Sequence, residues 1–474
     1  MELLNELVLR INDFIWTYIL IAMLIVLGIY FTAKTNFVQF RYFKEMFRLL
    51  GDGSSKDAKK EGKISSFQAF CISTASRVGT GNIAGIALAV VAGGPGAIFW
   101  MWLIALIGSA SGFVESTLAQ IYKVKDGKSY RGGPAYYMEQ GLNKKWMGVT
   151  FSVLITICFG FVFNAVQANT ITAAFNNAFG IDRFILGLVI AGLTALVIFG
   201  GANRIAKVSE VIVPILASLY ILVALFIMIT NLGEMPNVIK LIFSNALDFR
   251  SMSMGTMGGM ILIGVKRGLF SNEAGMGSAP NAAATAEVSH PVKQGLIQAL
   301  GVFVDTLIIC SCTAFIVLLY PGYATSSAEG IGLTQEALTY HIGPIGNIFI
   351  AVCILLFAFS SIVGNYYYGQ SNIEFMNNKK STMTVFRLVV VAFVLFGSVA
   401  QIKIVWNLAD VFMGLMAIIN LIAIALLGKY AFIALRDYEK QRKAGVENPI
   451  FDPSNIPGLE NVSGWNKDDD EIIA

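Results

Sequence analysis

The sequence is poor in charged residues. Only 14% of its 474 residues are Asp, Glu, Lys or Arg, whereas 56% are hydrophobic, and a soluble domain usually carries about 25% charged residues. A single globule could not bury so much apolar surface, so lipid must cover much of it. The formal net charge is only +4, and the basic residues fall in predicted loops, which makes a nucleic-acid partner unexpected.

Catalytic and metal-binding patterns are also missing. The two histidines, His290 and His341, stand in predicted loops, and the five cysteines lie in apolar runs without a histidine at metal-ligand spacing. We therefore interpret the cysteines as reduced packing residues. The sequence contains no P-loop, HExxH or GxSxG motif. It predicts no enzyme, no catalytic residues and no cofactor. The N-terminus lacks the basic region and cleavage site of a signal peptide.

Long apolar runs are abundant. A helix that crosses the hydrocarbon core needs about 20 apolar residues, and about eleven segments meet this requirement. They cover residues 14–33, 66–92, 96–121, 149–178, 184–201, 210–232, 252–288, 296–320, 345–373, 385–402 and 405–428. The fold class is therefore an all-α polytopic membrane protein.

Basic residues mark every second loop. Short cytoplasmic loops collect Lys and Arg, and here these residues gather in 34–63, 123–145, 204–207, 293, 379–387 and 436–443. The intervening loop 321–344 has none. We expect a cell-membrane protein whose N-terminus is outside and whose C-terminus is cytoplasmic.

Residues 37–50 are predicted to form an amphipathic helix. The apolar residues at helical spacing are Phe37, Phe40, Phe43, Phe47 and Leu50, and the basic residues on another face are Arg41, Lys44 and Arg48. This pattern fits a helix on the cytoplasmic membrane surface. An ordinary connecting helix fits it equally well.

Two of the apolar segments cannot be continuous helices. Gly79-Thr80-Gly81-Asn82 falls near the middle of one, and Gly268, Gly275, Gly277 and Pro280 interrupt the other. Non-helical backbone at membrane depth is tolerated only beside protein or a polar cavity. Close helix packing by small residues is the alternative. However, with one extra helix at the N-terminus, the breaks fall in the first helix of each group of five, as in a transporter built from inverted repeats.

A serine pair, Ser360-Ser361, lies inside the uncharged segment 345–373. Adjacent hydroxyls and backbone carbonyls suit a small hard cation such as Na⁺. The alternative is that both hydroxyls bond back to carbonyls of their own helix.

At these segments the sequence resembles the alanine or glycine:cation symporter family. The likeness covers about residues 14–435 and rests on RVGTGNIAG (77–85), GGPGAIFWMW (93–102), YRGGPAYYM (130–138), RGLFSNEAGMGSAPNAAA (267–284), HPVKQG (290–295) and FAFSSIVGNYYYGQ (357–370). The resemblance implies a leucine-transporter fold and Na⁺-coupled uptake of small neutral amino acids such as alanine or glycine. No cofactor is implied, since Na⁺ is co-transported.

The implied organisation has five parts. Residues 1–35 form the extra helix, 36–64 the basic cytoplasmic segment, 65–233 the first inverted repeat, 250–435 the second, and 436–474 a cytoplasmic tail. The first five core helices and the last five would each form one repeat.

The resemblance also implies a site. The substrate would contact Gly79, Thr80, Gly81, Asn82, Phe163, Gln167, Phe270, Ser271, Asn272 and Asn365. Na⁺ would lie between Ala75, Val78, Phe357, Ser360 and Ser361. Some family members carry a bulky aromatic where this chain has Asn365, so a longer substrate such as glutamine is a further candidate.

Several buried charges keep alternatives open. Arg77 is expensive at midspan unless it is paired, and we expect a structural pair with Glu115, Glu273 or Asp305 in preference to a contact with the substrate carboxylate. Asp305 and Asp410 fit either a proton relay or structural pairing. The alternatives to Na⁺ symport are therefore proton coupling through Asp305 or Glu273 and, less favoured, a channel.

Overall fold

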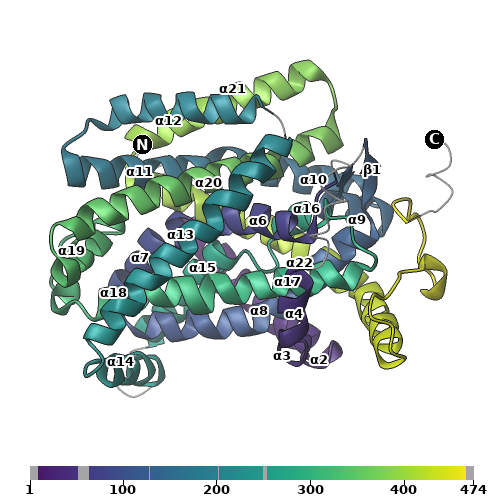
Figure 1. Cartoon of the computed structure of the whole chain (residues 1–474), viewed down its shortest axis with the longest axis horizontal. Helices are drawn as coiled ribbons and strands as arrows, with labels where there is room; N and C mark the ends of the chain where they lie inside the picture. The colour runs from purple at the N-terminus through teal and green to yellow at the C-terminus, as the bar shows by residue number, and fades with distance from the viewer. Residues whose placement is uncertain (1–8, 52–62, 128, 201, 249–253, 466–474) are drawn as a thin grey trace.

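The computed structural model describes residues 9–51, 63–127, 129–200, 202–248 and 254–465. Within these ranges the chain is a bundle of helices (Figure 1) with one antiparallel hairpin, β1 (Val124–Asp126) and β2 (Ser129–Arg131), in which Lys125 pairs with Tyr130. Parts of the predicted segments 1–35, 36–64 and 436–474, including the acidic end of the chain, lie outside the described residues.

The bundle consists of long helices joined by short ones. In chain order the α-helices are α2 (Ile21–Lys34), α3 (Val38–Arg41), α4 (Phe43–Leu50), α6 (Ser66–Arg77), α7 (Ile86–Gly93), α8 (Gly96–Ile121), α9 (Pro134–Gln140), α10 (Lys145–Ile155), α11 (Asn164–Phe179), α12 (Arg183–Ile198), α13 (Ala202–Thr230), α14 (Met235–Leu247), α15 (Met254–Asn272), α16 (Ala279–Ala283), α17 (Pro291–Val302), α18 (Ser311–Leu318), α19 (Ile331–Ile342), α20 (Ile345–Met376), α21 (Lys380–Val399) and α22 (Ile402–Lys443). The π-helical turns are Ile15–Leu20, Gly81–Gly85, Thr156–Phe163 and Phe303–Cys310, and the 3₁₀ turns are Pro321–Ala324 and Pro453–Asn455.

The membrane character is clear from length and hydropathy. Within the described residues, 7 helices are long and apolar enough to cross a membrane, or up to 9 if each sharply bent pair is one span. One bent pair is Ser66–Arg77 with Gly81–Gly93, at 50°. The shorter apolar helix α12 and the interrupted pair α15 and α16 occupy two further predicted segments. The protein is thus a helical polytopic membrane protein, and the count of eleven spans stays a prediction.

Local sequence explains where the helices near the breaks begin and end. The Ser65 hydroxyl accepts from the Gln68 amide at 3.2 Å and the Gln68 side chain accepts from the Ser65 amide at 3.1 Å, a capping box that starts α6. Gly94, at φ 71°, turns the chain into α8 with Pro95 as its cap. Gly180, at φ 68°, ends α11.

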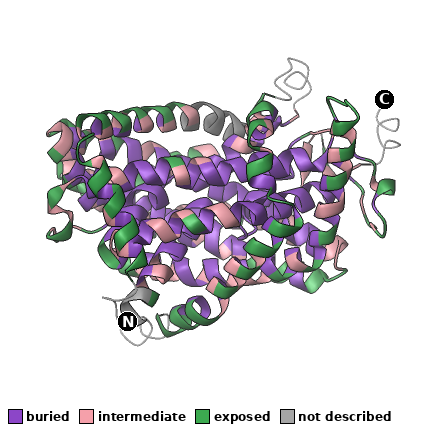
Figure 2. Ribbon diagram, turned by 90° about the horizontal axis from the view of Figure 1, so that it is seen from below, coloured by how far each residue is buried: buried purple, intermediate pink, exposed green. Residues whose placement is uncertain are grey.

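The interior lies between the interrupted helices and their partners. Helix α8 packs against α15 and α17, and α20 packs against α6, α11 and α13. Figure 2 shows buried residues in the middle of the bundle and exposed ones on its outer helices. Large apolar side chains such as Leu188, Leu196 and Leu388 are exposed on α12 and α21, and these helices run along one edge of Figure 1. Such surface suits contact with lipid.

Two of the expectations about connecting segments need correction. His341 is not in a loop: it lies in the last turn of α19, and its Nε2 is 3.1 Å from the Ile316 carbonyl. His290 stands in a loop, as expected, and its side chain caps α17, which begins at the next residue. Segment 37–50 is two helices instead of one, because Phe37, at φ 56°, precedes α3 and Tyr42 separates α3 from α4. None of the five cysteines forms a disulfide, and all are buried.

Candidate functional site

The first helix break begins where α6 ends. Val78, which follows α6, is extended, and its amide makes the last helical bond to Thr74 at 2.8 Å. In a continuous helix the Gly79 amide would donate to the Ala75 carbonyl, but it donates instead to Asn82 Oδ1 at 2.9 Å. The carbonyls of Ala75 and Val78 therefore come to the end of a half-helix, the position that favours a cation.

The second break separates α15 from α16. Glu273, Gly275 and Gly277 have φ angles of 58°, 84° and 82°. Glu115 of α8 accepts hydrogen bonds from the amides of Gly275 at 3.1 Å and Gly277 at 3.0 Å, and Asn420 donates to the same carboxylate at 2.8 Å. A buried carboxylate thus satisfies backbone groups that lipid could not satisfy.

A carboxylate also joins the two breaks. Asn82 donates to Ser271 Oγ at 2.9 Å and to Asp305 Oδ1 at 2.6 Å, and Ser271 donates to Asp305 Oδ2 at 2.7 Å. Asn82 and Asp305 both belong to π-helical turns, Gly81–Gly85 and Phe303–Cys310. Such turns frequently occur at functional sites.

Gln167 and an aromatic stack border the first break. The Thr80 amide donates to Gln167 Oε1 at 3.0 Å. Phe163 stacks on Phe270 with ring centroids 4.5 Å apart, and Phe270 contacts Trp406 at 4.7 Å. Gly81 lies against Phe270, because a Cβ at residue 81 would be 2.9 Å from its ring. One buried region thus contains eight of the predicted substrate residues: Gly79, Thr80, Gly81, Asn82, Phe163, Gln167, Phe270 and Ser271.

The serine pair of α20 faces the end of α6. Ser361 Oγ is 3.2 Å from the Val78 carbonyl and 3.0 Å from the Phe357 carbonyl, and Ser360 Oγ is 2.8 Å from the Phe357 carbonyl. The helix-internal bonds of the alternative interpretation are therefore present, and Ser361 makes a contact to α6 as well. These oxygens are hard and neutral, as are the groups that bind a small hard cation.

Asn365 and Asn272 lie beside the second break. The Ser76 hydroxyl is 2.6 Å from Asn365 Oδ1 and 3.0 Å from Glu273 Oε1. Asn272 Oδ1 accepts from the Ala274 amide at 3.0 Å. The Nδ2 atoms of Asn365 and Asn272 are buried and have no hydrogen-bond partner among the described residues. Because a buried donor without a partner costs about 1–3 kcal/mol, both groups are available to a polar ligand.

The expected ion pair of Arg77 is not found. Within the described residues, Arg77 makes no ion pair, and its Nη1 donates to the Gln298 carbonyl at 3.4 Å while Nε and Nη2 have no partner. The guanidinium lies against Gly301 of α17, where an added Cβ would overlap it. The sequence could not show this direction of the side chain.

Asp410 is the charge that does pair. Arg267 Nη2 is 2.6 Å from Asp410 Oδ1, and Lys266 Nζ is 3.6 Å from Asp410 Oδ2. All three side chains are buried. The geometry therefore supports structural pairing for Asp410, whereas Asp305 is held by hydrogen bonds from neutral groups.

Three residues of this region were not identified from the sequence. Trp406 contacts the aromatic stack, and Glu115 and Asn420 support the second break. Glu115 was considered only as a partner of Arg77. The signals were a carboxylate and an amide in otherwise apolar helices, which marks them as functional candidates inside a membrane.

The chain matches known transporters over most of its length. The sodium:alanine symporter family matches residues 1–453. The amino-acid carrier protein AlsT of Bacillus subtilis (strain 168) is 55% identical over 98% of this chain and 99% of its own. The probable sodium/glutamine symporter GlnT of the same organism is 55% identical over 98% of this chain and 96% of its own.

A solved structure resembles the fold at much lower identity. The crystal structure of MhsT in complex with L-phenylalanine has a TM-score of 0.57 at 17% identity and covers 81% of this chain and 98% of that chain. This likeness supports the leucine-transporter fold alone. The chain is thus a multi-pass membrane transporter and not an enzyme, and it belongs to the sodium:alanine symporter family.

Proposed function

We propose that this protein takes up small neutral amino acids by Na⁺ symport and alternating access. The observation that carries the proposal is the meeting of two interrupted helices, where Asn82, Ser271 and Asp305 are joined by hydrogen bonds. Half-helix ends of this kind bind anionic groups at their N-termini and cations at their carbonyls. The carboxylate of an amino acid needs the half-helix N-terminus, and a Na⁺ ion needs the free carbonyls.

The carboxylate of the amino acid would bind at the first break. The amides around Gly79, Thr80 and Gly81 would be the donors. The substrate would replace Asn82 Oδ1 as the acceptor of the Gly79 amide and Gln167 Oε1 as the acceptor of the Thr80 amide. Phe163 and Phe270 would contact the substrate side chain, and Ser271, Asn272 and Asn365 would line the far side. Every one of these residues is buried, which supports an occluded arrangement.

Sodium would bind between α6 and α20. Its ligands would be the carbonyls of Ala75, Val78 and Phe357 and the hydroxyls of Ser360 and Ser361. Occupation would fix the end of α6 against α20 and so order the substrate amides. One charge that moves through 100 mV supplies about 2.3 kcal/mol, which corresponds to roughly a fifty-fold gradient of substrate.

The preferred substrate is best tested by competition. The family is described by alanine, and one relative at 55% identity is named for glutamine. Uptake of labelled alanine in the presence of excess unlabelled alanine, glycine, serine or glutamine measures the preference directly. Inhibition by these compounds supports the proposal, whereas no alanine uptake and no inhibition by any of them would refute it.

The proposed topology has eleven spans in a five-plus-five core preceded by one extra helix. The domain boundaries would be 1–35, 36–64, 65–233, 250–435 and 436–474, with the N-terminus outside and the C-terminus cytoplasmic. Basic residues in alternate loops support this orientation. Labelling of single cysteines placed at each end of the chain, from each side of the membrane, tests it.

Proton coupling is the second candidate. Glu273 and Asp305 are buried without an ion pair within the described residues, so either could carry a proton. Uptake that follows a pH gradient and ignores Na⁺ would favour it. A channel is tested separately, since counterflow exchange of labelled for unlabelled substrate requires a carrier.

A further inference from the structure

Two half-helices of the site are tied together by one loop. Residues 284–290 connect α16 to α17, and this connecting loop pairs with the start of α6 through a bridge between Ile64 and Ala286. The Glu287 amide donates to the Ile64 carbonyl at 3.0 Å, and Lys63 Nζ lies 3.0 Å from Glu287 Oε1. A displacement of this loop therefore acts on the N-terminal end of α6 and on the C-terminal end of α16.

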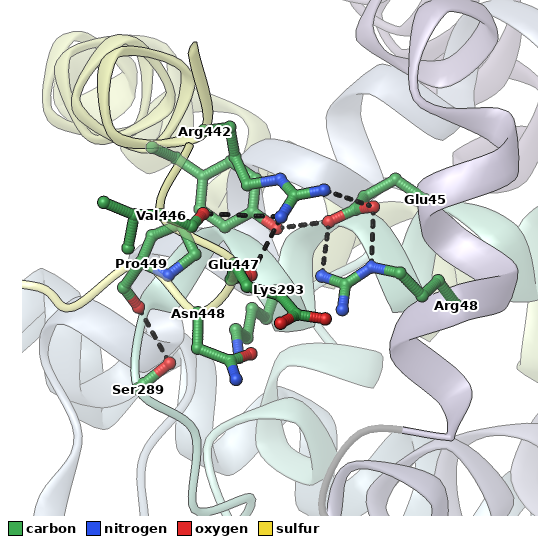
Figure 3. A network of polar contacts seen from close by, with 10 residues as sticks. Glu45, Arg48, Ser289, Lys293, Arg442, Val446, Glu447, Asn448 and Pro449 are labelled. Atoms are coloured by element: carbon green, nitrogen blue, oxygen red, sulfur yellow. Dashed lines mark hydrogen bonds and ion pairs between the residues drawn. The ribbon is translucent and has the colours of Figure 1, made fainter. Parts of the chain in front are cut away.

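The chain after α22 folds back onto the same loop. We name residues 446–465 the strap. The Phe451 amide donates to the Ser289 carbonyl at 2.8 Å, and Ser289 Oγ donates to the Pro449 carbonyl at 2.8 Å. Lys293 Nζ is 3.4 Å from Asn448 Oδ1. Figure 3 shows Ser289 beside Pro449 and the start of the strap beside Arg442.

Aromatic contacts anchor the far part of the strap. Phe451 is 5% exposed, and its ring lies 5.4 Å from His290 and 4.9 Å from Trp465. Trp465 Nε1 donates to the Gln120 carbonyl at 2.9 Å. The Lys123 ammonium lies 4.3 Å from the Trp465 ring and donates to the Ala286 carbonyl at 3.3 Å. The strap thus contacts the connecting loop directly at Ser289 and His290, and indirectly at Ala286 through Lys123.

The root of the strap is held by α4. Arg442 donates to the Glu447 carbonyl at 2.9 Å and lies 3.7 Å from Glu45 Oε2. Glu45 also accepts from Tyr438 at 2.7 Å and from Arg48 (Figure 3). Further along, Tyr430 donates to the Gly458 carbonyl at 2.6 Å. The strap is therefore fixed at both ends and crosses the connecting loop between them.

We propose that the strap holds α6 and α16 in the closed position and thereby restrains opening of the site toward the C-terminal face. This inference rests on the proposed alternating-access function. Alternating access moves one group of helices against another around the site, and α6 cannot separate from α16 without breaking the Ile64 pairing or pulling the connecting loop away from the strap. Release of the strap would then favour the state open at that face.

Cys71 provides the measurement. It is a thiol of α6 that is 1% exposed, and Cys353 of α20, 2% exposed, serves as an internal reference. In the full-length protein in detergent, a soluble maleimide is added and each cysteine is followed by mass spectrometry of its peptide. In Phe451→Ala/Trp465→Ala we expect Cys71 to react about tenfold faster, since population of an open state scales directly with its equilibrium constant. Cys353 should be unchanged.

Two further variants make the test specific. Gly464→Ala keeps both aromatic rings, but its Cβ would lie 2.5 Å from the Lys123 carbonyl oxygen, so it should lift the strap and accelerate Cys71 as well. It also serves if the double variant fails to fold. Ile450→Ala changes a strap side chain that is 64% exposed and should have no effect.

Unchanged reaction of Cys71 in folded strap variants would overturn the proposal. Equal acceleration of Cys71 and Cys353 would also overturn it, because it would indicate general loosening. Alkylation needs neither Na⁺ nor substrate, so failure of the proposed transport function would appear in uptake assays and not here.

Discussion

At the scale of single residues, the serine hydroxyls test the Na⁺ site. Ser360→Ala with Ser361→Ala removes two candidate ligands and little volume, so we expect the Na⁺ concentration for half-maximal uptake to rise about tenfold or more, as for the loss of about 1.4 kcal/mol or more of binding free energy. Ser371→Ala is the matched control, because Ser371 is a buried serine of the same helix whose hydroxyl has no partner in the part of the chain that the structure describes. An unchanged Na⁺ dependence in the folded double variant would remove the serines from the site.

Gly79 tests the substrate amides. A Cβ at this position would overlap Ser361 Oγ and lie 2.8 Å from Gln167 Oε1, so Gly79→Val should abolish substrate binding while membrane insertion stays normal. Gly192→Val is the control, since a Cβ at residue 192 would meet no described atom beyond its own helix within 4 Å. Binding is measured with labelled alanine on purified protein. Wild-type affinity in Gly79→Val would mean that the carboxylate binds elsewhere.

Asn365 tests the size of the substrate pocket. If its unpartnered Nδ2 faces the substrate, Asn365→Trp fills the space of a longer side chain, and inhibition of alanine uptake by glutamine should be lost before alanine transport itself. The competing explanation is that Asn365 only packs on Ser76, in which case Trp overpacks and destabilises the protein by about 1–3 kcal/mol. Equal loss for every substrate would support that explanation.

At the scale of elements, the Glu45 carboxylate attaches α4 to Tyr438 and Arg442 of α22. Hydrogen bonds from Arg48 hold the pKa of Glu45 well below its usual value, lowering it from 4.5 to about 2. A lowered carboxylate pKa contributes stability that is present above about pH 4.5 and is lost as the pH falls toward 2. Glu45→Gln should therefore lower Tm by about 2 °C at pH 7, because a partly exposed pair contributes little.

The pH dependence is the decisive part of that measurement. The difference in Tm between Glu45→Gln and the wild type should shrink as the pH is lowered below 4.5. Glu139→Gln, whose partner Lys145 is 77% exposed, should leave Tm unchanged at every pH. A difference that grows on acidification would contradict the role assigned to Glu45.

The interrupted helices could be predicted from the sequence, because glycines in the middle of an apolar segment weaken the helix at that point. The bonds that join the breaks were not predictable: Asn82 contacts Asp305, 223 positions away, and Trp465 contacts Gln120, 345 positions away. Such pairs leave no periodic pattern in one sequence. The predicted ion pair of Arg77 is wrong for the same reason, since the surroundings of this side chain depend on how α6 and α17 pack.

At the scale of the whole molecule, lipid-facing helices surround a polar interior. Glu115, Glu273, Asp305 and Arg77 are all buried near the two breaks. Acidic side chains inside a membrane protein mark ion pathways and proton relays, and these three make no ion pair among the described residues. Buried acidic groups of this kind fit coupling to Na⁺ and coupling to protons equally well. A transport measurement on the whole protein is needed to separate the two.

Uptake of labelled alanine into proteoliposomes tests Na⁺ coupling most directly. An inward Na⁺ gradient is applied with no pH gradient, and K⁺ replaces Na⁺ in the control. The account predicts accumulation above the external alanine concentration with Na⁺ and none with K⁺, and loss of accumulation when an ionophore collapses the Na⁺ gradient. Equal uptake in K⁺, or accumulation driven by a pH gradient in the absence of Na⁺, would contradict Na⁺ symport.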